Sequence, residues 1–198
     1  MNLSDGRSVD VRPLERCDRG LVEAAITRLS DESRYLRFGT AKPRMTEREL
    51  DRLMDVDHHG QEALLAVDPA TGRGVALMSY VQVPGEPEVV ELAATVADDW
   101  QGVGLGAALL AELTHRARDE GHSVLRAHVL AVNNRSLAML RSWTSGKSVG
   151  EACPELSEPC ETPRKREPVI WTLLLMMSGE GTVLMIGCEE ALMPRPAS

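Results

Sequence analysis

Aromatic residues are scarce in this sequence: they make up 3% of its 198 residues, so Leu, Val, Ala and Met must supply most of the core. Positive charge is also in deficit, because 22 Lys and Arg residues oppose 30 Asp and Glu residues and leave a formal net charge of −8. A chain this acidic is not expected to bind nucleic acid. Its charge suits a partner that carries an amine.

Cysteines and long apolar runs are sparse as well. No two of the four cysteines have C-x-x-C spacing, so we expect free thiols in a reducing compartment and no metal site, for Cys17, Cys153, Cys160 and Cys188. The longest apolar run, Val169 to Met177, is too short to cross a bilayer. The N-terminus lacks a basic-then-apolar signal pattern. The sequence therefore predicts a cytoplasmic protein with no membrane partner.

Hydrophobic periodicity and turn residues predict one α/β domain. Strands are expected at 8–14, 62–67, 74–83, 89–96 and 124–130. Helices are expected from an N-cap at Asp18 to residue 29, as a short helix or turn at 29–38, from a capping box at 46–54, and at 104–120 and 133–143. An antiparallel meander followed by a β-α-β unit predicts a mixed, mostly antiparallel central sheet flanked by helices.

A glycine-rich stretch follows the strand expected at 89–96. Three glycines in five positions let the backbone turn tightly and approach a ligand closely, and the following helix start leaves N–H groups unpaired beside a partial positive charge. The stretch therefore predicts a phosphate or pyrophosphate site. The alternative is a connection that only packs, because the stretch has neither G-x-G-x-x-G nor P-loop spacing. Its residues are Gln101, Gly102, Val103, Gly104, Leu105, Gly106 and Ala107.

The spacing Gln101-x-x-Gly104-x-Gly106 resembles the pyrophosphate-binding motif of the GNAT acetyltransferase family, Arg/Gln-x-x-Gly-x-Gly/Ala. The predicted element order over residues 8–143 resembles the fold of that family. The segment 29–38 resembles the "L-S-x-E-S-R-Y-x-R-F" stretch of a bacterial subgroup that includes protein-lysine acetyltransferases.

This resemblance implies acetyl-CoA as co-substrate. The diphosphate would bind backbone N–H groups between Gly102 and Ala107, and the pantetheine and acetyl group would follow the backbone from Ala94 to Val96. Asn133, or Asn134 if the frame is shifted by one, would begin the last helix and contact the cofactor arm. Tyr35 and Phe38 would lie beside the acceptor entrance.

Two residues are candidates for the general base. Glu91 interrupts an apolar strand, where a carboxylate is costly unless it is solvated or paired and where desolvation raises its pKa; it also matches an acidic residue that several members of the family use as base. The simpler interpretation is a strand residue that faces solvent or pairs with Arg. His128, five residues before Asn133, is the rival base, with a pKa suited to the role, or else a polar residue on an exposed strand face.

The usual general acid of the family is a Tyr seven residues after the helix-starting Asn, but position 140 is Leu. Water, Tyr35 or Tyr80 would then have to protonate the leaving thiolate.

The C-terminal part departs from the family pattern. Thr144 and Ser145 stand where the family has Gly-Phe, and Glu155 to Pro168 is rich in proline and charge. Strands are expected at 169–175 and 183–186. We therefore divide the chain into an acetyltransferase core, 1–143, and C-terminal strands or an atypical tail of the same domain, 144–198. Either the tail is a divergent hairpin, or it is translated out of the ancestral frame, which resequencing the gene would decide.

We thus expect an acetyl-CoA-dependent N-acetyltransferase that transfers directly to a primary amine in a ternary complex. The resemblance of segment 29–38 favours a protein lysine as acceptor. A small-molecule amine is the alternative acceptor, and a non-catalytic module that senses acetyl-CoA is the alternative function. A homodimer is the candidate assembly.

Overall fold

The computed structural model describes residues 1–39, 44–144, 170–178 and 181–189. Its strands are β1 (Asp10–Pro13), β2 (Gln61–Asp68), β3 (Arg73–Val83), β4 (Glu86–Val96), β5 (Val124–Leu130), β6 (Ile170–Ser178) and β7 (Gly181–Glu189). Its helices are η1 (Arg16–Asp18), α1 (Arg19–Arg28), α2 (Asp31–Phe38), α3 (Glu47–Met54), η2 (Asp98–Trp100), α4 (Leu105–Asp119) and α5 (Asn134–Thr144).

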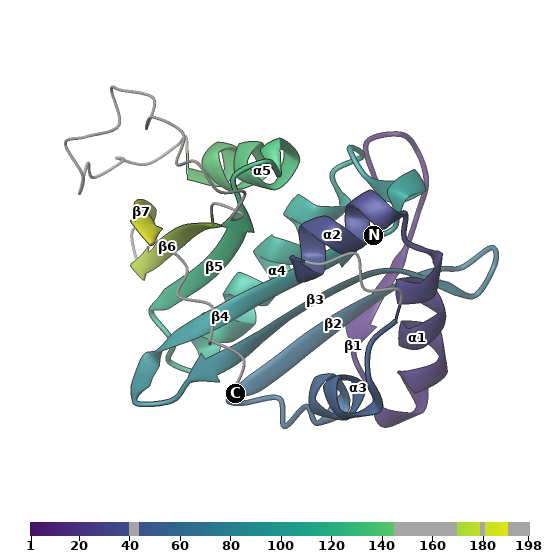
Figure 1. Ribbon diagram of the computed structural model, residues 1–198, viewed down its shortest axis with the longest axis horizontal. Helices are drawn as coiled ribbons and strands as arrows, with labels where there is room; N and C mark the ends of the chain where they lie inside the picture. Colours follow the sequence, from purple (N-terminus) through teal and green to yellow (C-terminus); the bar gives the residue numbers. More distant parts are fainter. Residues whose placement is uncertain (40–43, 145–169, 179–180, 190–198) are drawn as a thin grey trace, which may run out of the picture.

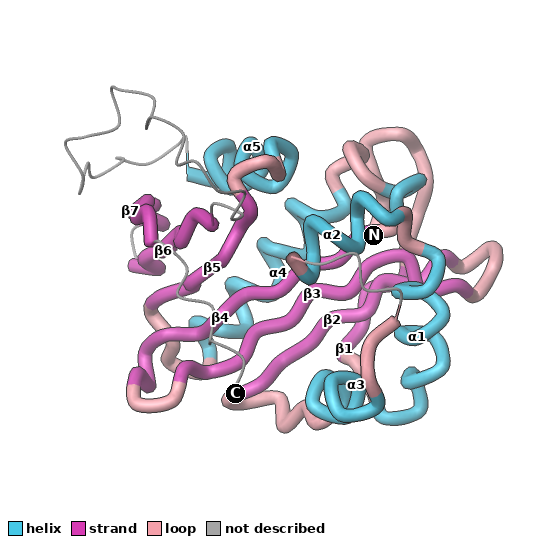
Figure 2. The backbone as a smooth tube through the Cα atoms, viewed as in Figure 1, coloured by secondary structure: helices cyan, strands magenta, loops and turns pink. Residues whose placement is uncertain are grey.

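The seven strands form one sheet in the order in which they occur along the chain. Every neighbouring pair is antiparallel except β4 and β5, which are parallel and are joined through α4. Figures 1 and 2 show the long strands β2, β3 and β4 side by side, with helices around them. The predicted fold class, a mixed and mostly antiparallel sheet flanked by helices, is confirmed.

Each face of the sheet has its own apolar core. One face packs against α4 and α5, through a cluster that includes Leu64, Met78, Tyr80, Val90, Leu105, Leu109, Leu113, Leu125, Leu137 and Leu140. The other face packs against α1 and α3, through Leu14, Val22, Ile26, Leu50, Met54, Ala63, Leu65 and Leu77. We call these faces the α4 face and the α1 face. Alternation along each strand assigns its side chains to one or the other.

The capping signals of the sequence have different outcomes. The box at α3 is present, because the Glu49 N–H donates to Thr46 Oγ1 (3.3 Å) and the Thr46 N–H donates to the Glu49 carboxylate (2.8 Å). Asp18 stands at the cap position of α1, yet its carboxylate does not cap the helix. It is 3% exposed and accepts two hydrogen bonds from Arg12, each of 2.6 Å. The tertiary ion pair has replaced the predicted cap.

The two strands expected in the C-terminal part are present and longer than expected. Strand β6 pairs with β5, and β7 pairs with β6 over nine residues. Residues 145–169, which include Cys153, Cys160 and the proline-rich stretch, lie outside the described residues. Cys17, the cysteine whose side chain is described, is an exposed free thiol on η1.

Candidate functional site

Strands β4 and β5 pair over only four residues and then separate. Their parallel ladder joins 89–92 of β4 to 124–127 of β5. Strand β4 nevertheless stays paired with β3 as far as Val96. Figure 1 shows β4 and β5 diverging towards α2 and α5. Beyond Leu92 the two strands therefore present unpaired edges to one another, and the Ala94–Val96 backbone lies along this opening.

The glycine-rich loop begins where β4 ends. Gly102 and Gly104 have φ angles of +78° and +89°, in the left-handed region that other residues rarely adopt. A Cβ on either glycine would meet no atom within 4 Å, so both face open space among the described residues. Helix α4 follows at Leu105 without a side-chain cap. A helix start of this kind, with open backbone N–H groups, is suited to an anion.

Gly106 has a different role. It lies within α4 and its φ is not positive, but an added Cβ would lie 3.1 Å from Met139 Sδ on α5. Gly106 therefore lets α4 and α5 pack closely, whereas Gly102 and Gly104 shape the loop.

Gln101 connects the loop to three neighbouring elements. Its amide nitrogen donates to the Val96 carbonyl (2.9 Å) and to Ser33 Oγ on α2 (3.2 Å). Its amide oxygen accepts a hydrogen bond from Arg135 on α5. At the same helix, Asn133 Oδ1 accepts from the Ser136 N–H (3.1 Å), which identifies Asn133, rather than Asn134, as the cap of α5.

Both candidate bases lie on the α1 face beside the opening. Val90, Leu92, Ala94 and Val96 pack on the α4 face, so Glu91 and Thr95 point the other way. Glu91 is level with Arg126 of β5, and His128 lies two residues further along the same face. With about 4.8 Å between strands and about 3.3 Å per residue, the Cα atoms of Glu91 and His128 are at least roughly 8 Å apart. Both residues are exposed, so Glu91 is a strand residue that faces solvent, the simpler of the two interpretations given for it above.

Helix α2 covers this face next to Glu91. Arg37 Nε donates to Thr95 Oγ1 (3.2 Å) and its guanidinium stacks 5.1 Å from the centre of the Phe38 ring. Burial lowers the pKa of Arg37, and the charge of Glu91 opposes that shift. Tyr35 is 37% exposed, whereas Phe38 packs against the α1-face core. Of the two residues expected at the acceptor entrance, Tyr35 is available to a partner and Phe38 has a packing role.

The tyrosine candidates for the general acid differ in position. Tyr80 is fully buried on the α4 face, where its hydroxyl donates to the His59 carbonyl (3.2 Å) and burial raises its pKa to about 12. It therefore cannot reach or protonate a thiolate at the opening. Leu140, in the position of the family's tyrosine, is buried in the α4-face core. Tyr35 is the remaining tyrosine on the site side.

Asp98, on η2 between β4 and the loop, was not identified from the sequence. Its carboxylate accepts hydrogen bonds from Ser30 N (2.9 Å), Ser30 Oγ (2.8 Å) and Ser33 Oγ (2.5 Å). Ser4 also contacts the site, because its backbone N–H and its hydroxyl both donate to the Val103 carbonyl. The sequence signal for Ser30 was only that of a helix cap, a role which it also has.

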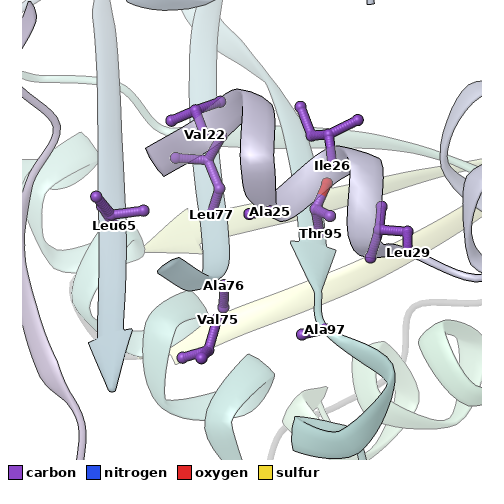
Figure 3. A pocket seen from close by; sticks show the side chains of 10 residues that line it. All are labelled: Val22, Ala25, Ile26, Leu29, Leu65, Val75, Ala76, Leu77, Thr95 and Ala97. Carbon is purple, nitrogen blue, oxygen red and sulfur yellow. The ribbon is translucent and has the colours of Figure 1, made fainter. Parts of the chain in front are cut away.

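A small apolar pocket lies between α1 and the sheet; its lining includes Thr95 of β4 and Ala97, which follows that strand (Figure 3). Its volume of about 10 Å³ holds at most about one water molecule. This pocket is therefore a packing space and not an acceptor site. No group of His, Cys, Asp and Glu side chains suited to a metal ion occurs among the described residues. Within the same residues, no helix has both the length and the apolar character needed to cross a membrane.

Comparison with known proteins gives consistent matches. A model of the acetyltransferase (GNAT) family matches residues 24–143. An acetyltransferase of Pseudomonas aeruginosa is 38% identical over 122 residues, which are 61% of this chain and 65% of that protein. Acetyltransferase Pat of Mycolicibacterium smegmatis is 31% identical over 120 residues, which are 61% of this chain and 34% of that protein. The match thus spans less than two thirds of either relative.

Solved structures share the fold. The GNAT domain of S. lividans PAT has a TM-score of 0.69 and 26% identity, covering 78% of this chain and 90% of that domain. A phosphinothricin acetyltransferase of Sinorhizobium meliloti, solved in complex with acetyl-CoA, has a TM-score of 0.57 and 20% identity, covering 68% of this chain and 72% of that one.

Proposed function

Since this chain belongs to the acetyltransferase (GNAT) family, we propose that it binds acetyl-CoA and transfers the acetyl group to a primary amine. The observation that carries this proposal is the combination of an open glycine loop, an uncapped start of α4 and the separation of β4 from β5. All three lie at the same end of β4.

The residues at this end fit acetyl-CoA. Gly102 and Gly104 leave open the space that a Cβ would fill, and the backbone N–H groups from Gly102 to Ala107 would bind the diphosphate. The backbone of Ala94 to Val96 would border the pantetheine and the acetyl group. When bound, acetyl-CoA supplies an activated thioester carbonyl.

For transfer, the neutral amine nitrogen forms a bond to the acetyl carbon and the carbon–sulfur bond breaks. The proton that the nitrogen loses on becoming an amide passes, directly or through water, to the sulfur, which leaves as the thiol. The amine must first lose a proton to a base. We assign that role to Glu91, with His128 as the rival, because both lie on the exposed α1 face at the opening. As the family resemblance implies, we propose that transfer is direct, in a ternary complex.

A protein lysine is the acceptor that we favour, because Tyr35 of the 29–38 segment is exposed on α2, the helix that contacts Thr95 beside Glu91. A small-molecule amine is the alternative acceptor. One observation favours a second function, a module that binds acetyl-CoA without turnover: the position of the usual general acid is filled by the buried Leu140.

The test is calorimetric titration with acetyl-CoA, together with coenzyme A release over a panel of amines and a lysine-bearing protein. We expect binding with turnover, and Glu91→Gln should lower kcat/KM by about 10²–10⁴-fold, the usual contribution of a general base, with little change in the Kd for acetyl-CoA. The same measurements on His128→Gln test the alternative that His128 is the general base. The matched control is Glu88→Gln, because Glu88 is an exposed carboxylate on the same strand as Glu91. Its side chain accepts a hydrogen bond from Ser123.

Three results would change the conclusion. If Glu91→Gln keeps full activity and His128→Gln loses it, the general base is His128 on β5. Binding without turnover on every acceptor would favour the sensor module. Failure to bind acetyl-CoA at all would refute the proposed function.

A further inference from the structure

Helix α2 is attached to the rest of the protein mainly through polar contacts. None of its eight residues has a fully buried side chain, although the Arg37 guanidinium is desolvated. Phe38 fixes its C-terminal end against the α1-face core, and Gly39, with φ +68°, ends the helix. At the N-terminal end, Leu29, which precedes the cap residue, is buried between α1 and the sheet, and the first turn of the helix is held by polar contacts.

Asp98 provides the anchor at that N-terminal end. One carboxylate accepts three hydrogen bonds from the first turn of α2 and its cap, at 2.5–2.9 Å. A carboxylate beside the first turn of a helix is also favoured by the helix dipole. Desolvation acts to raise the pKa of Asp98, but the hydrogen bonds from Ser33 and Ser30 outweigh it and keep the pKa below its ordinary value.

The same anchor connects α2 to the glycine loop. Asp98 lies on η2, three residues before Gln101, and Gln101 itself donates to Ser33 Oγ. On the other side, α2 places Arg37 against the α1 face of β4, where its guanidinium contacts Thr95. The helix thus runs from the cofactor side of the site, at Ser33, to the face that holds Glu91.

From this arrangement we infer that Asp98 is a positioning residue for the acceptor: by holding Ser30 and Ser33, it fixes α2 on the turn that leads into the cofactor loop. This inference rests on the proposed function for its effect on the acceptor. Its effect on α2 itself depends only on the contacts of Asp98. Asp98 does not touch the reacting atoms.

Hydrogen exchange measured by mass spectrometry on the full chain tests the anchor. Asp98→Ala should speed exchange of the α2 amides by about tenfold, because the first turn of the helix and its cap lose three hydrogen bonds. Ser33→Ala should have part of this effect, and Ser33→Thr, which keeps the hydroxyl, should restore protection. Asp68→Ala is the matched control, since Asp68 also accepts a hydroxyl (2.6 Å) and a backbone N–H (2.9 Å), but in the β2–β3 turn.

Kinetics then test the effect on the acceptor. With the amine that the wild type acetylates fastest, Asp98→Ala should raise the acceptor KM about tenfold, with kcat and the Kd for acetyl-CoA changed less than about twofold. A general folding defect would instead lower the melting temperature and weaken acetyl-CoA binding together. Asp98→Asn, which keeps one acceptor oxygen, should fall between the wild type and Asp98→Ala.

Unchanged α2 exchange in Asp98→Ala would overturn the inference. Faster exchange with an unchanged acceptor KM would also overturn it, because α2 would then have no part in acceptor binding. If the wild type acetylates no amine, the proposed function fails, and the exchange measurement by itself decides whether Asp98 holds α2.

Discussion

The motif spacing treats Gly104 and Gly106 alike, but the structure predicts different consequences of replacing each with Ala. Gly104 adopts φ +89° at the cap of α4, so Ala there is strained. The left-handed conformation costs about 1–2 kcal/mol for a residue with a Cβ, and restriction of the unfolded chain offsets about 0.4–1 kcal/mol of this. Gly104→Ala should therefore lower the free energy of unfolding by about 0.5–1.5 kcal/mol.

Gly106→Ala should be nearly neutral for stability. Ala is favoured over Gly inside a helix by about 0.5–1 kcal/mol. Against this, the new Cβ would lie 3.1 Å from Met139 Sδ. That atom belongs to a flexible side chain, so a shift of a few tenths of an ångström relieves the contact. The gain and the cost are of similar size.

Acetyl-CoA binding should separate the two variants further. The Cβ of Ala at position 104 would occupy space with no protein atom within 4 Å, where we place the diphosphate. We expect the Kd for acetyl-CoA to rise at least about tenfold in Gly104→Ala, and by less than about threefold in Gly106→Ala.

Thermal unfolding and calorimetric titration of both variants provide the assay. For a chain of this size, about 1 kcal/mol corresponds to a change of about 2–4 °C in melting temperature. Equal losses of affinity in the two variants would refute the assignment of different roles to these glycines. Wild-type affinity in Gly104→Ala would show that the open space beside the loop does not receive the cofactor.

Two further predictions concern contacts made by arginine. Asp18→Asn should lower the free energy of unfolding at neutral pH by about 1–3 kcal/mol, towards the low end because Arg12 is 39% exposed and solvent screens the pair. Hydrogen bonding to Arg12 holds the pKa of Asp18 below its ordinary value. The contribution of Asp18 to the free energy of unfolding is therefore complete above the pKa of Asp18 in the unfolded chain, and it is lost as pH falls through the pKa in the folded protein. Denaturant unfolding at successively lower pH should show this loss in the wild type and not in Asp18→Asn. The glycine loop has no cation of its own, and Arg135 supplies one by donating a hydrogen bond to Gln101. Arg135→Gln should therefore weaken acetyl-CoA binding about three- to tenfold and reduce the salt dependence of binding. Arg73→Gln, at the exposed start of β3, should change neither. Wild-type acid sensitivity in Asp18→Asn, or an unchanged salt dependence in Arg135→Gln, would contradict the respective assignments.

The sequence by itself determined the features that depend on neighbouring residues. The capping box at Thr46 and Glu49, the turn between β2 and β3, and the positive φ angles of Gly102 and Gly104 follow from local chemistry, because their partners are within a few positions along the chain. The loop at Gln101–Ala107 was recognisable for the same reason. Strand and helix order then predicted the mixed sheet.

Only the tertiary structure decided which side chains meet over long distances in the chain. Asp98 and Ser30 are 68 positions apart, as are Gln101 and Ser33, and no pattern in the sequence indicates these pairs. His122 is buried and contacts the Pro87 carbonyl, 35 positions away in the chain. The folded structure also decided one pair at short range: Asp18 has the residue type of a helix cap but pairs with Arg12, six positions before it.

The opening between β4 and β5 is the clearest example. Strand periodicity predicts where each strand lies, but it contains no signal for where a ladder stops. The pairing ends at Leu92 and Ala127, and this end point places the backbone of Ala94–Val96, the glycine loop and Glu91 around one space. Local sequence therefore specified the parts of the site, and the geometry of the sheet brought them together.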